Sequence, residues 1–247
     1  MDWSFLSTQK ISQVYYQHLS NHCYFCRIKS NQLICPNCLN GFQLNQHHCE
    51  KCKLPSEEGI ELCGRCQKKP PQYDHLISPF VYQGLSKALI TALKFSSHYH
   101  ACHPLCHLLA QELNKFYAQP RTPWPDALIP VPSHTERIRE RGFCHMSLLS
   151  HHLNSYLAIN IPINTFTLIK NKHLAPQHAL DKKQRHRLKA NSFHCIQKPP
   201  SHIALFDDVV TTGSTLDACI TTLKLAGAKK IDVWSLARTP SSNTKHN

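Results

Sequence analysis

HIALFDDVVTTGSTLDACITTLKLAGAKKIDVWSL, residues 202–236, is the stretch that decides the fold. A short apolar run ends in two carboxylates, Asp207 and Asp208, and a threonine-rich loop leads from them into an amphipathic segment that a glycine terminates. This order predicts a strand, a loop and a helix over residues 214–226. In α/β proteins such a unit places backbone N–H groups and the positive end of a helix at the carboxyl edge of the sheet, where ligands bind.

The loop between this strand and this helix has the composition of a phosphate site. It offers four hydroxyl donors within five residues, and its glycine lets the backbone approach a ligand closely. The residues concerned are Thr211, Thr212, Gly213, Ser214 and Thr215. Two adjacent acids would repel a bare anion, so Asp207 and Asp208 need ribose hydroxyls or a magnesium ion as partners. A sugar phosphate meets both requirements.

Two other phosphate-binding motifs are missing from this stretch. A Walker loop requires Gly-Lys-Ser/Thr and a dinucleotide fingerprint requires paired glycines, and neither occurs here. The alternative without a ligand is an acidic turn before an ordinary capped helix, which leaves the combination of acids, hydroxyls and glycine unexplained.

From residue 75 onward, β-rich runs alternate with helical ones. Strands are expected over residues 75–82, 127–132, 166–169, 202–206 and 230–236, and helices over 85–95, 103–117, 141–157 and 214–226. This alternation predicts the α/β class, with a doubly wound, mainly parallel sheet and helices on its faces.

Eight of the thirteen cysteines lie within 44 residues as four Cys-x-x-Cys pairs. Their members are Cys23 and Cys26, Cys35 and Cys38, Cys49 and Cys52, and Cys63 and Cys66. Two such turns complete a tetrahedral zinc site, so eight thiolates make two structural sites with no position left for catalysis. The segment is too small to build its own core, and zinc is expected to stabilise it as a small N-terminal double zinc ribbon.

The spacing of the cysteines leaves two pairings open. Sequential sites, formed by the first two and the last two pairs, need only short loops and are favoured over interleaved sites. A redox role would need a thioredoxin-like strand and helix around one pair, which this segment lacks.

A chain of 247 residues suits one full domain and a small accessory one. Its formal charge of +13 predicts attraction to phosphates, either of small anions or of a nucleic-acid backbone. Residues 128–199 hold eleven Lys or Arg against three Asp or Glu, which places the phosphate-facing surface in the second half. Without a run of ~20 apolar residues or a secretory signal, a cytoplasmic protein with no membrane insertion is expected.

These motifs together resemble those of the ComF/GntX family, whose members join a double zinc ribbon to a type I phosphoribosyltransferase-like domain. LFDDVVTTGST is similar to the motif that binds phosphoribosyl pyrophosphate (PRPP), and the resemblance covers about residues 20–238. Further marks are the run PVPSHTERIRERGF and the pair Ala237 and Arg238. Cys144 and His145 depart from the pattern, because the family usually has Asn-Gln at these positions.

The resemblance implies a site for PRPP with Mg²⁺. Asp207 and Asp208 would hold the ribose 2′ and 3′ hydroxyls, and the loop 211–215 the 5′-phosphate. Cations would hold the pyrophosphate, and the candidates are His134, Arg137, Arg141 and Lys94. A solvated basic helix face, with Glu136 and Glu140 as salt partners, is the alternative for the arginines.

The expected organisation has four parts. They are an N-terminal helix over residues 1–20, the double zinc ribbon over 21–70, the phosphoribosyltransferase-like domain over 71–240 and a disordered tail over 241–247. The resemblance implies a role in DNA uptake and natural transformation, with transfer of ribosyl phosphate from PRPP to an unidentified acceptor. A non-catalytic PRPP-binding protein, or an accessory protein that handles single-stranded DNA, is the alternative. The partners implied are PRPP, single-stranded DNA and proteins of DNA uptake and recombination.

Overall fold

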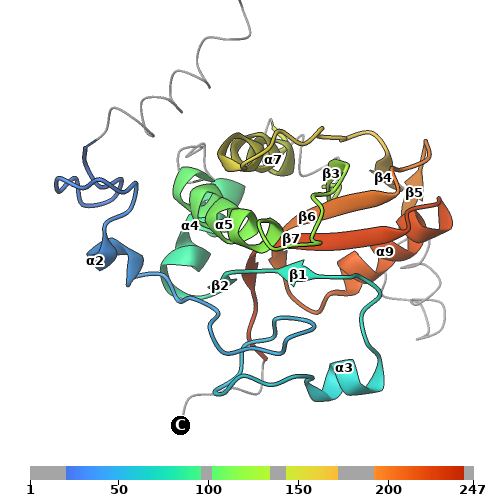
Figure 1. Ribbon diagram of the computed structural model, residues 1–247, viewed down its shortest axis with the longest axis horizontal. Helices are drawn as coiled ribbons and strands as arrows, with labels where there is room; N and C mark the ends of the chain where they lie inside the picture. The colour runs from blue at the N-terminus through green and yellow to red at the C-terminus, as the bar shows by residue number, and fades with distance from the viewer. Residues whose placement is uncertain (1–20, 96–101, 134–142, 172–191, 242–247) are drawn as a thin grey trace, which may run out of the picture.

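The computed structural model describes residues 21–95, 102–133, 143–171 and 192–241. Within them a parallel sheet lies between two layers of helices, and the chain before the sheet is largely irregular with two short helices (Figure 1). The helix expected at the N-terminus lies outside the described residues, as does the tail after residue 241.

The N-terminal segment contains turns around its cysteines rather than long elements. Helix α2, Pro36–Leu39, begins directly after Cys35, and helix α3, Gly64–Lys68, begins directly after Cys63. Pro36 suits the start of α2, because the first residue of a helix has no intrahelical N–H bond to lose. Each of these helices therefore carries one Cys-x-x-Cys pair across a single turn.

The main sheet has five strands, and the pairings among them are parallel. The strands are β1 (Leu76–Ile77), β2 (Phe80–Val81), β3 (Ala127–Pro130), β6 (His202–Val210) and β7 (Lys230–Arg238). β6 and β7 lie at the centre, β3 pairs with β6, and β1 and β2 follow one another along β7. Parallel neighbours of this kind require crossover connections, which the helices supply.

Several strands differ from the sequence prediction. The run over residues 75–82 forms two strands, because Pro79 between them has no N–H for the ladder. β6 continues beyond its apolar run, to Val210. β4, Leu168–Lys170, pairs antiparallel with β5, Phe193–Cys195, and β5 has no counterpart in the prediction.

Helices cover both faces of the sheet (Figure 1). On one face lie α4 (Gly84–Phe95), α5 (Cys102–Tyr117) and α7 (His145–Tyr156), and on the other lies α9 (Ser214–Leu225). The helix expected to start at residue 141 starts at His145 in the described part of the chain.

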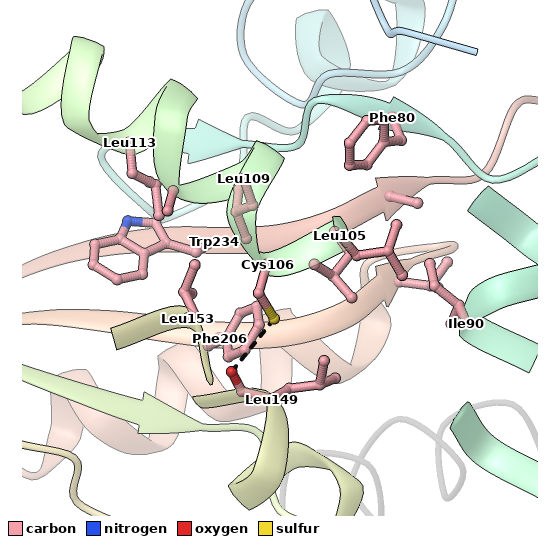
Figure 2. Close-up of a cluster of buried hydrophobic side chains, with 14 of the residues drawn as sticks. Phe80, Ile90, Leu105, Cys106, Leu109, Leu113, Leu149, Leu153, Phe206 and Trp234 are labelled. Carbon is pink, nitrogen blue, oxygen red and sulfur yellow. Dashed lines mark hydrogen bonds between the residues drawn. The ribbon is translucent and has the colours of Figure 1, made fainter. Parts of the chain in front are cut away.

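The larger core lies between the sheet and the three helices on one face. Trp234 of β7 and Phe206 of β6 are fully buried there with Leu109 of α5 (Figure 2). Cys106 packs in the same cluster, where its Sγ lies 3.7 Å from the carbonyl oxygen of Leu149. These contacts hold α5 and α7 against the central strands.

The second core lies between the sheet and α9. Leu205 and Val233 reach it from the strands and pack in one cluster with Leu216 and Ile220 of the helix. β6 and β7 are thus buried on both faces, which explains their nearly continuous apolar sequences. The predicted α/β class with a doubly wound parallel sheet is confirmed. Among the residues that the structure describes, no helix is both long and apolar enough to cross a membrane.

Candidate functional site

The predicted site lies where β6 passes into α9. Asp207 and Asp208 lie inside the strand, so the expectation that they follow it was wrong. The strand extends past them because Val209 and Val210 are buried and continue the pairing with β7. The acid pair is therefore held by the sheet itself rather than by a loop.

Residues 211–213 form the turn between β6 and α9. Gly213 is the N-cap of α9 and has a φ of 77°, a left-handed conformation that other side chains disfavour. The hydroxyl oxygens of Thr212 and Ser214 are 3.1 Å apart. Thr211, Thr212 and Thr215 are exposed. Hydroxyl donors thus gather at the positive end of a helix of 12 residues, which favours an anion.

Asp208 is buried and engaged by two basic side chains. Its Oδ2 lies 2.8 Å from Nζ of Lys94 in α4 and 3.0 Å from Nε2 of His145 in α7. Burial raises the pKa of Asp208, but the hydrogen bond with His145 and the charge of Lys94 outweigh burial and lower it below its ordinary value. Asp208 therefore stays ionised at neutral pH, and its carboxylate joins α4 and α7 to the centre of the sheet.

Asp207 has the opposite electrostatics. It is half-buried, and its Oδ1 accepts a hydrogen bond of 2.9 Å from the backbone N–H of Asp208. Burial, together with repulsion by the Asp208 carboxylate, raises the pKa of Asp207 to about 7. The pair thus combines one permanent charge with one carboxyl group that titrates near neutral pH.

A cleft of about 200 Å³ lies beside the acid pair. Its polar lining consists of Lys94, Ser133, His145, Lys170, Asp207, Asp208 and Thr215. Cations and carboxylates therefore face the same small space. Such a lining suits a ligand that carries both anionic groups and hydroxyls.

The cleft brings together some of the predicted site residues. Both acids, Lys94 and Thr215 line it, and the rest of the hydroxyl-rich turn lies next to Thr215 in the chain. The cations predicted to bind pyrophosphate include His134, Arg137 and Arg141, and these three lie outside the described residues.

Three side chains that contact the acids or the turn were not predicted as site residues. His145 was noticed only as a departure from the family pattern, yet it contacts Asp208. Arg65 donates through Nη1 to the carbonyl oxygen of Thr212, and the buried Arg238 donates to carbonyl oxygens at the end of β6. Arg65 lies between Cys63 and Cys66, and nothing in the neighbouring sequence indicates that it contacts the turn at Thr212.

The eight cysteines form two clusters. Cys23, Cys26, Cys35 and Cys38 make the first cysteine cluster, and Cys49, Cys52, Cys63 and Cys66 make the second cysteine cluster. Within each cluster the Sγ atoms all lie within 4.8 Å of one another. The sequential pairing is therefore confirmed.

Both clusters fit a tetrahedral zinc ion. In each, two sulfurs from different pairs lie 3.6 Å apart, Cys26 with Cys35 and Cys52 with Cys63. Sulfurs around zinc with bonds of about 2.3 Å lie about 3.8 Å apart, so little movement is needed. Backbone N–H groups also donate to sulfurs, from Cys35 to Cys23 at 3.4 Å and from Cys63 to Cys49 at 3.2 Å. With four sulfur ligands, zinc would be structural at both clusters.

Replacing Asp207 with asparagine is expected to stabilise the protein at alkaline pH. Because the pKa of Asp207 is raised, its ionisation destabilises the folded state as the pH rises from about 4 to about 7. Above pH 7 the neutral amide avoids this cost. The melting temperature at pH 8 should rise by roughly 5 °C, and the difference should vanish at about pH 3.5, where Asp207 is protonated in both the folded and the unfolded state. Thermal denaturation at the two pH values measures this effect.

The matched control is Asp208→Asn, for which the sign is reversed. Since the pKa of Asp208 is lowered, its charge contributes stability above the unfolded pKa, and this contribution is lost as the pH falls. Removing it leaves Lys94 and His145 without their carboxylate, so the melting temperature at pH 8 should fall. Equal shifts for both variants would contradict the asymmetry of the acid pair.

The fold and the site define an α/β protein with a parallel sheet, two four-cysteine clusters and an acid pair before a hydroxyl-rich turn. Solved structures similar to part of the chain include a hypoxanthine phosphoribosyl transferase from Trypanosoma cruzi. It has a TM-score of 0.38 and 12% identity, over 58% of this chain and 76% of that chain. The allosteric regulatory enzyme of purine biosynthesis matches with a TM-score of 0.37 and 18% identity, over 56% of this chain and 26% of that one.

No family model matches the chain, but curated relatives match most of its length. The DNA utilization protein YhgH of Salmonella typhi is 32% identical over 222 residues, which are 88% of this chain and 96% of that protein. Competence protein F of Haemophilus influenzae is 32% identical over 196 residues, 77% of this chain and 84% of that protein. The chain therefore belongs to the family of YhgH and competence protein F, as the ComF/GntX resemblance predicted.

Proposed function

We propose that this protein binds PRPP together with Mg²⁺ in the cleft beside Asp207 and Asp208. The observation that carries the proposal is the position of these acids within the last four residues of a central parallel strand, next to a hydroxyl-rich turn at the positive end of α9. A ribose 5-phosphate presents a diol and an anion that match these two features. The motif LFDDVVTTGST supports the same ligand.

Different residues of the site bind different groups of PRPP. Asp207 and Asp208 accept hydrogen bonds from the ribose 2′ and 3′ hydroxyls, while residues 211–215 donate hydroxyl and N–H groups to the 5′-phosphate. Lys94 and Lys170 line the same cleft and favour the pyrophosphate, together with the predicted cations at 134, 137 and 141. The net charge of the whole protein, +13, also favours a ligand with several negative charges.

Asp207 is the better candidate to hold Mg²⁺. Lys94 and His145 already engage Asp208, whereas the raised pKa of Asp207 shows that its charge is under-compensated. When bound, the ion would neutralise charge on the pyrophosphate. Since a divalent ion favours the ionised carboxyl group, Asp207 should give up its proton on binding below pH 7.

The activity that this site supports is transfer of ribosyl phosphate. The bond between the anomeric carbon and pyrophosphate breaks, and the pyrophosphate leaves with the electron pair. A nucleophile of the acceptor forms the new bond and releases its proton to water. The anomeric carbon becomes positively charged on the way, as in glycoside hydrolysis. The cations at the cleft stabilise the leaving group, and the acid pair holds the ribose in place.

A non-catalytic PRPP-binding protein is the second candidate. The observation that favours it is the engagement of Asp208 by both Lys94 and His145, which makes this acid part of the packing between sheet and helices. A sensor needs a ligand site that is coupled to the surrounding structure, but needs no acceptor pocket.

We propose a cytoplasmic role in DNA uptake for the protein in either case. The names of its relatives, a DNA utilization protein and a competence protein, support this role. Thiolate zinc sites suit a reducing compartment. Single-stranded DNA and proteins of DNA uptake and recombination are the proposed partners, and the positive charge favours the former.

Calorimetric titration with PRPP and Mg²⁺ tests the ligand. Binding is expected in the micromolar range, with weaker binding of ribose 5-phosphate and of pyrophosphate alone, because each presents half of the recognised groups. An absence of heat and of any thermal shift with all three compounds would overturn the proposal. Measuring pyrophosphate release in the presence of a panel of nucleobases then distinguishes a phosphoribosyltransferase from a non-catalytic PRPP-binding protein.

A further inference from the structure

Two arginines connect the second cysteine cluster to the hydroxyl-rich turn. Arg65 lies in α3 between two of the cluster's cysteines, and its Nη1 donates to the carbonyl oxygen of Thr212. Its Nη2 lies 3.4 Å from Oδ2 of Asp217 in the first turn of α9. A side chain at Gly213 would meet the same guanidinium group at 3.5 Å. Arg65 therefore covers the turn from the side of the cysteine cluster.

Arg238, the last residue of β7, makes the second connection. It is 4% exposed, and its Nε donates to the carbonyl oxygen of Cys52 at 3.1 Å. Its Nη1 donates to the carbonyl oxygens of Val210, at 2.8 Å, and of Thr211. One buried guanidinium group thus joins a ligand residue of the second cysteine cluster to the start of the turn.

These bonds determine which way the peptide groups of the turn point. In a trans peptide the C=O of one residue and the N–H of the next lie on opposite sides, and the described residues contain no cis peptide. The carbonyls of residues 210, 211 and 212 all accept from Arg238 or Arg65. The N–H groups of Thr211, Thr212 and Gly213 are therefore directed away from the arginines.

The first cysteine cluster has different contacts. Phe25 beside it contacts Phe42 with ring centroids 5.9 Å apart, and Phe42 contacts Phe80 of β2 with ring centroids 5.3 Å apart. A Cβ at Gly41 would lie 3.4 Å from Leu85 of α4. Figure 1 shows α2 on one side of the molecule and α3 close to α9. The two clusters thus support different parts of the fold.

We infer that the second cysteine cluster holds the turn in its anion-binding form, and that Arg65 and Arg238 are the positioning residues. A metal-loaded second cluster fixes the position of Arg65 and of the Cys52 carbonyl, and these fix the N–H groups that face the anion. Loss of the metal at the second cluster, but not at the first, releases the turn. The nature of the anion rests on the proposed function, whereas the coupling between cluster and turn does not.

Hydrogen exchange on the full-length protein tests the coupling without a ligand. In Arg65→Ala, the backbone amide of Asp217, which donates to the Gly213 carbonyl of the turn at 2.9 Å, should exchange at least about tenfold faster, while amides of residues 203–206 stay protected by the sheet. Arg65→Lys keeps one donor for the Thr212 carbonyl and should restore part of the protection. The matched control is Arg27→Ala, an exposed arginine of the first cysteine cluster, which should leave the turn unchanged.

Cysteine variants extend the test to the metal. The pair Cys63→Ser with Cys66→Ser should lower the zinc content and accelerate exchange of the Asp217 amide. The pair Cys23→Ser with Cys26→Ser should lower the zinc content as much but leave the Asp217 amide protected. Equal acceleration by both pairs, or unchanged exchange in Arg65→Ala, would overturn the coupling.

A titration with ribose 5-phosphate separates the coupling from the proposed ligand. Affinity should fall about tenfold in Arg65→Ala, with partial recovery in Arg65→Lys, at unchanged zinc content. Wild-type binding that Arg65→Ala leaves intact would refute the inference and keep the proposed function. Failure of wild-type protein to bind PRPP would refute the proposed function, and the exchange experiment would still decide the coupling.

Discussion

Replacing Asp207 and Asp208 together with asparagine is expected to weaken the binding of PRPP with Mg²⁺ at least about 100-fold. Each carboxylate accepts a charge-assisted hydrogen bond from a ribose hydroxyl, and losing two such bonds accounts for this factor. Asparagine has nearly the same shape, so the cleft keeps its volume. The change therefore removes the charge and the cation site while leaving the sheet in place.

Calorimetry with the purified double variant measures this loss, and circular dichroism confirms that the fold is retained. Glu112→Gln provides a control, because Glu112 lies on α5 away from the cleft and pairs with the exposed Lys115. It removes one negative charge without touching the acid pair. Binding by the double variant at wild-type strength would show that the ligand sits elsewhere. In cells, the double variant should abolish DNA transformation.

The two acids make this test informative, because they act on stability in opposite directions. Asp207 lowers stability at neutral pH and Asp208 raises it, so the opposite shifts in melting temperature of the two single variants should partly cancel in the double variant. A site that keeps a destabilising carboxyl group next to a like charge is typical of a site selected for binding rather than for stability.

Removal of zinc is expected to unfold the chain over residues 21–70. The described part of this segment consists of turns and two helices of four and five residues, and the cysteines supply most of its buried side chains. Structural zinc in such segments contributes about 10 kcal/mol or more of folding free energy. Without the ion, only weak hydrogen bonds to sulfur are left to hold the four thiol groups of each cluster together.

Limited proteolysis after treatment with a chelator measures this unfolding. New cleavage sites should appear between Cys23 and Cys66, while the sheet from β3 onward resists, because it has its own two cores. Adding Zn²⁺ back should restore the original fragments, and Mg²⁺ should not, since it prefers oxygen ligands. An unchanged digestion pattern after complete removal of zinc would contradict the assignment.

Much of the fold was predictable from local signals. Four pairs of cysteines at a spacing of two are a pattern that few structures other than zinc sites explain, and sequential pairing followed from short loops. The central unit of strand, turn and helix followed from an apolar run, a glycine before the helix and a glycine after it. These signals work because each depends on neighbours within a few residues.

Predictions failed where an element depends on a distant strand. β6 extends through Asp207 and Asp208 because β7 offers partners to Asp207 and, beyond Asp208, to Val209 and Val210, although acids are poor strand formers. β5 forms because Phe193 and its neighbours pair with β4, and no periodic pattern of its own marks it. Propensity describes a residue in isolation, whereas ladder pairing and burial are decided by the partner strand.

The amino-acid sequence alone determined the chemistry that this protein has available: thiolates for metal, paired carboxylates and a hydroxyl-rich turn. Such groups are recognised by their type and by short spacings. Only the tertiary structure decided which basic side chains contact the carboxylates and the turn. Lys94 and His145 reach Asp208 from separate helices, and Arg65 reaches the turn from the second cysteine cluster. Electrostatic contact depends on distance in space, and 147 residues of chain separate Arg65 from Thr212.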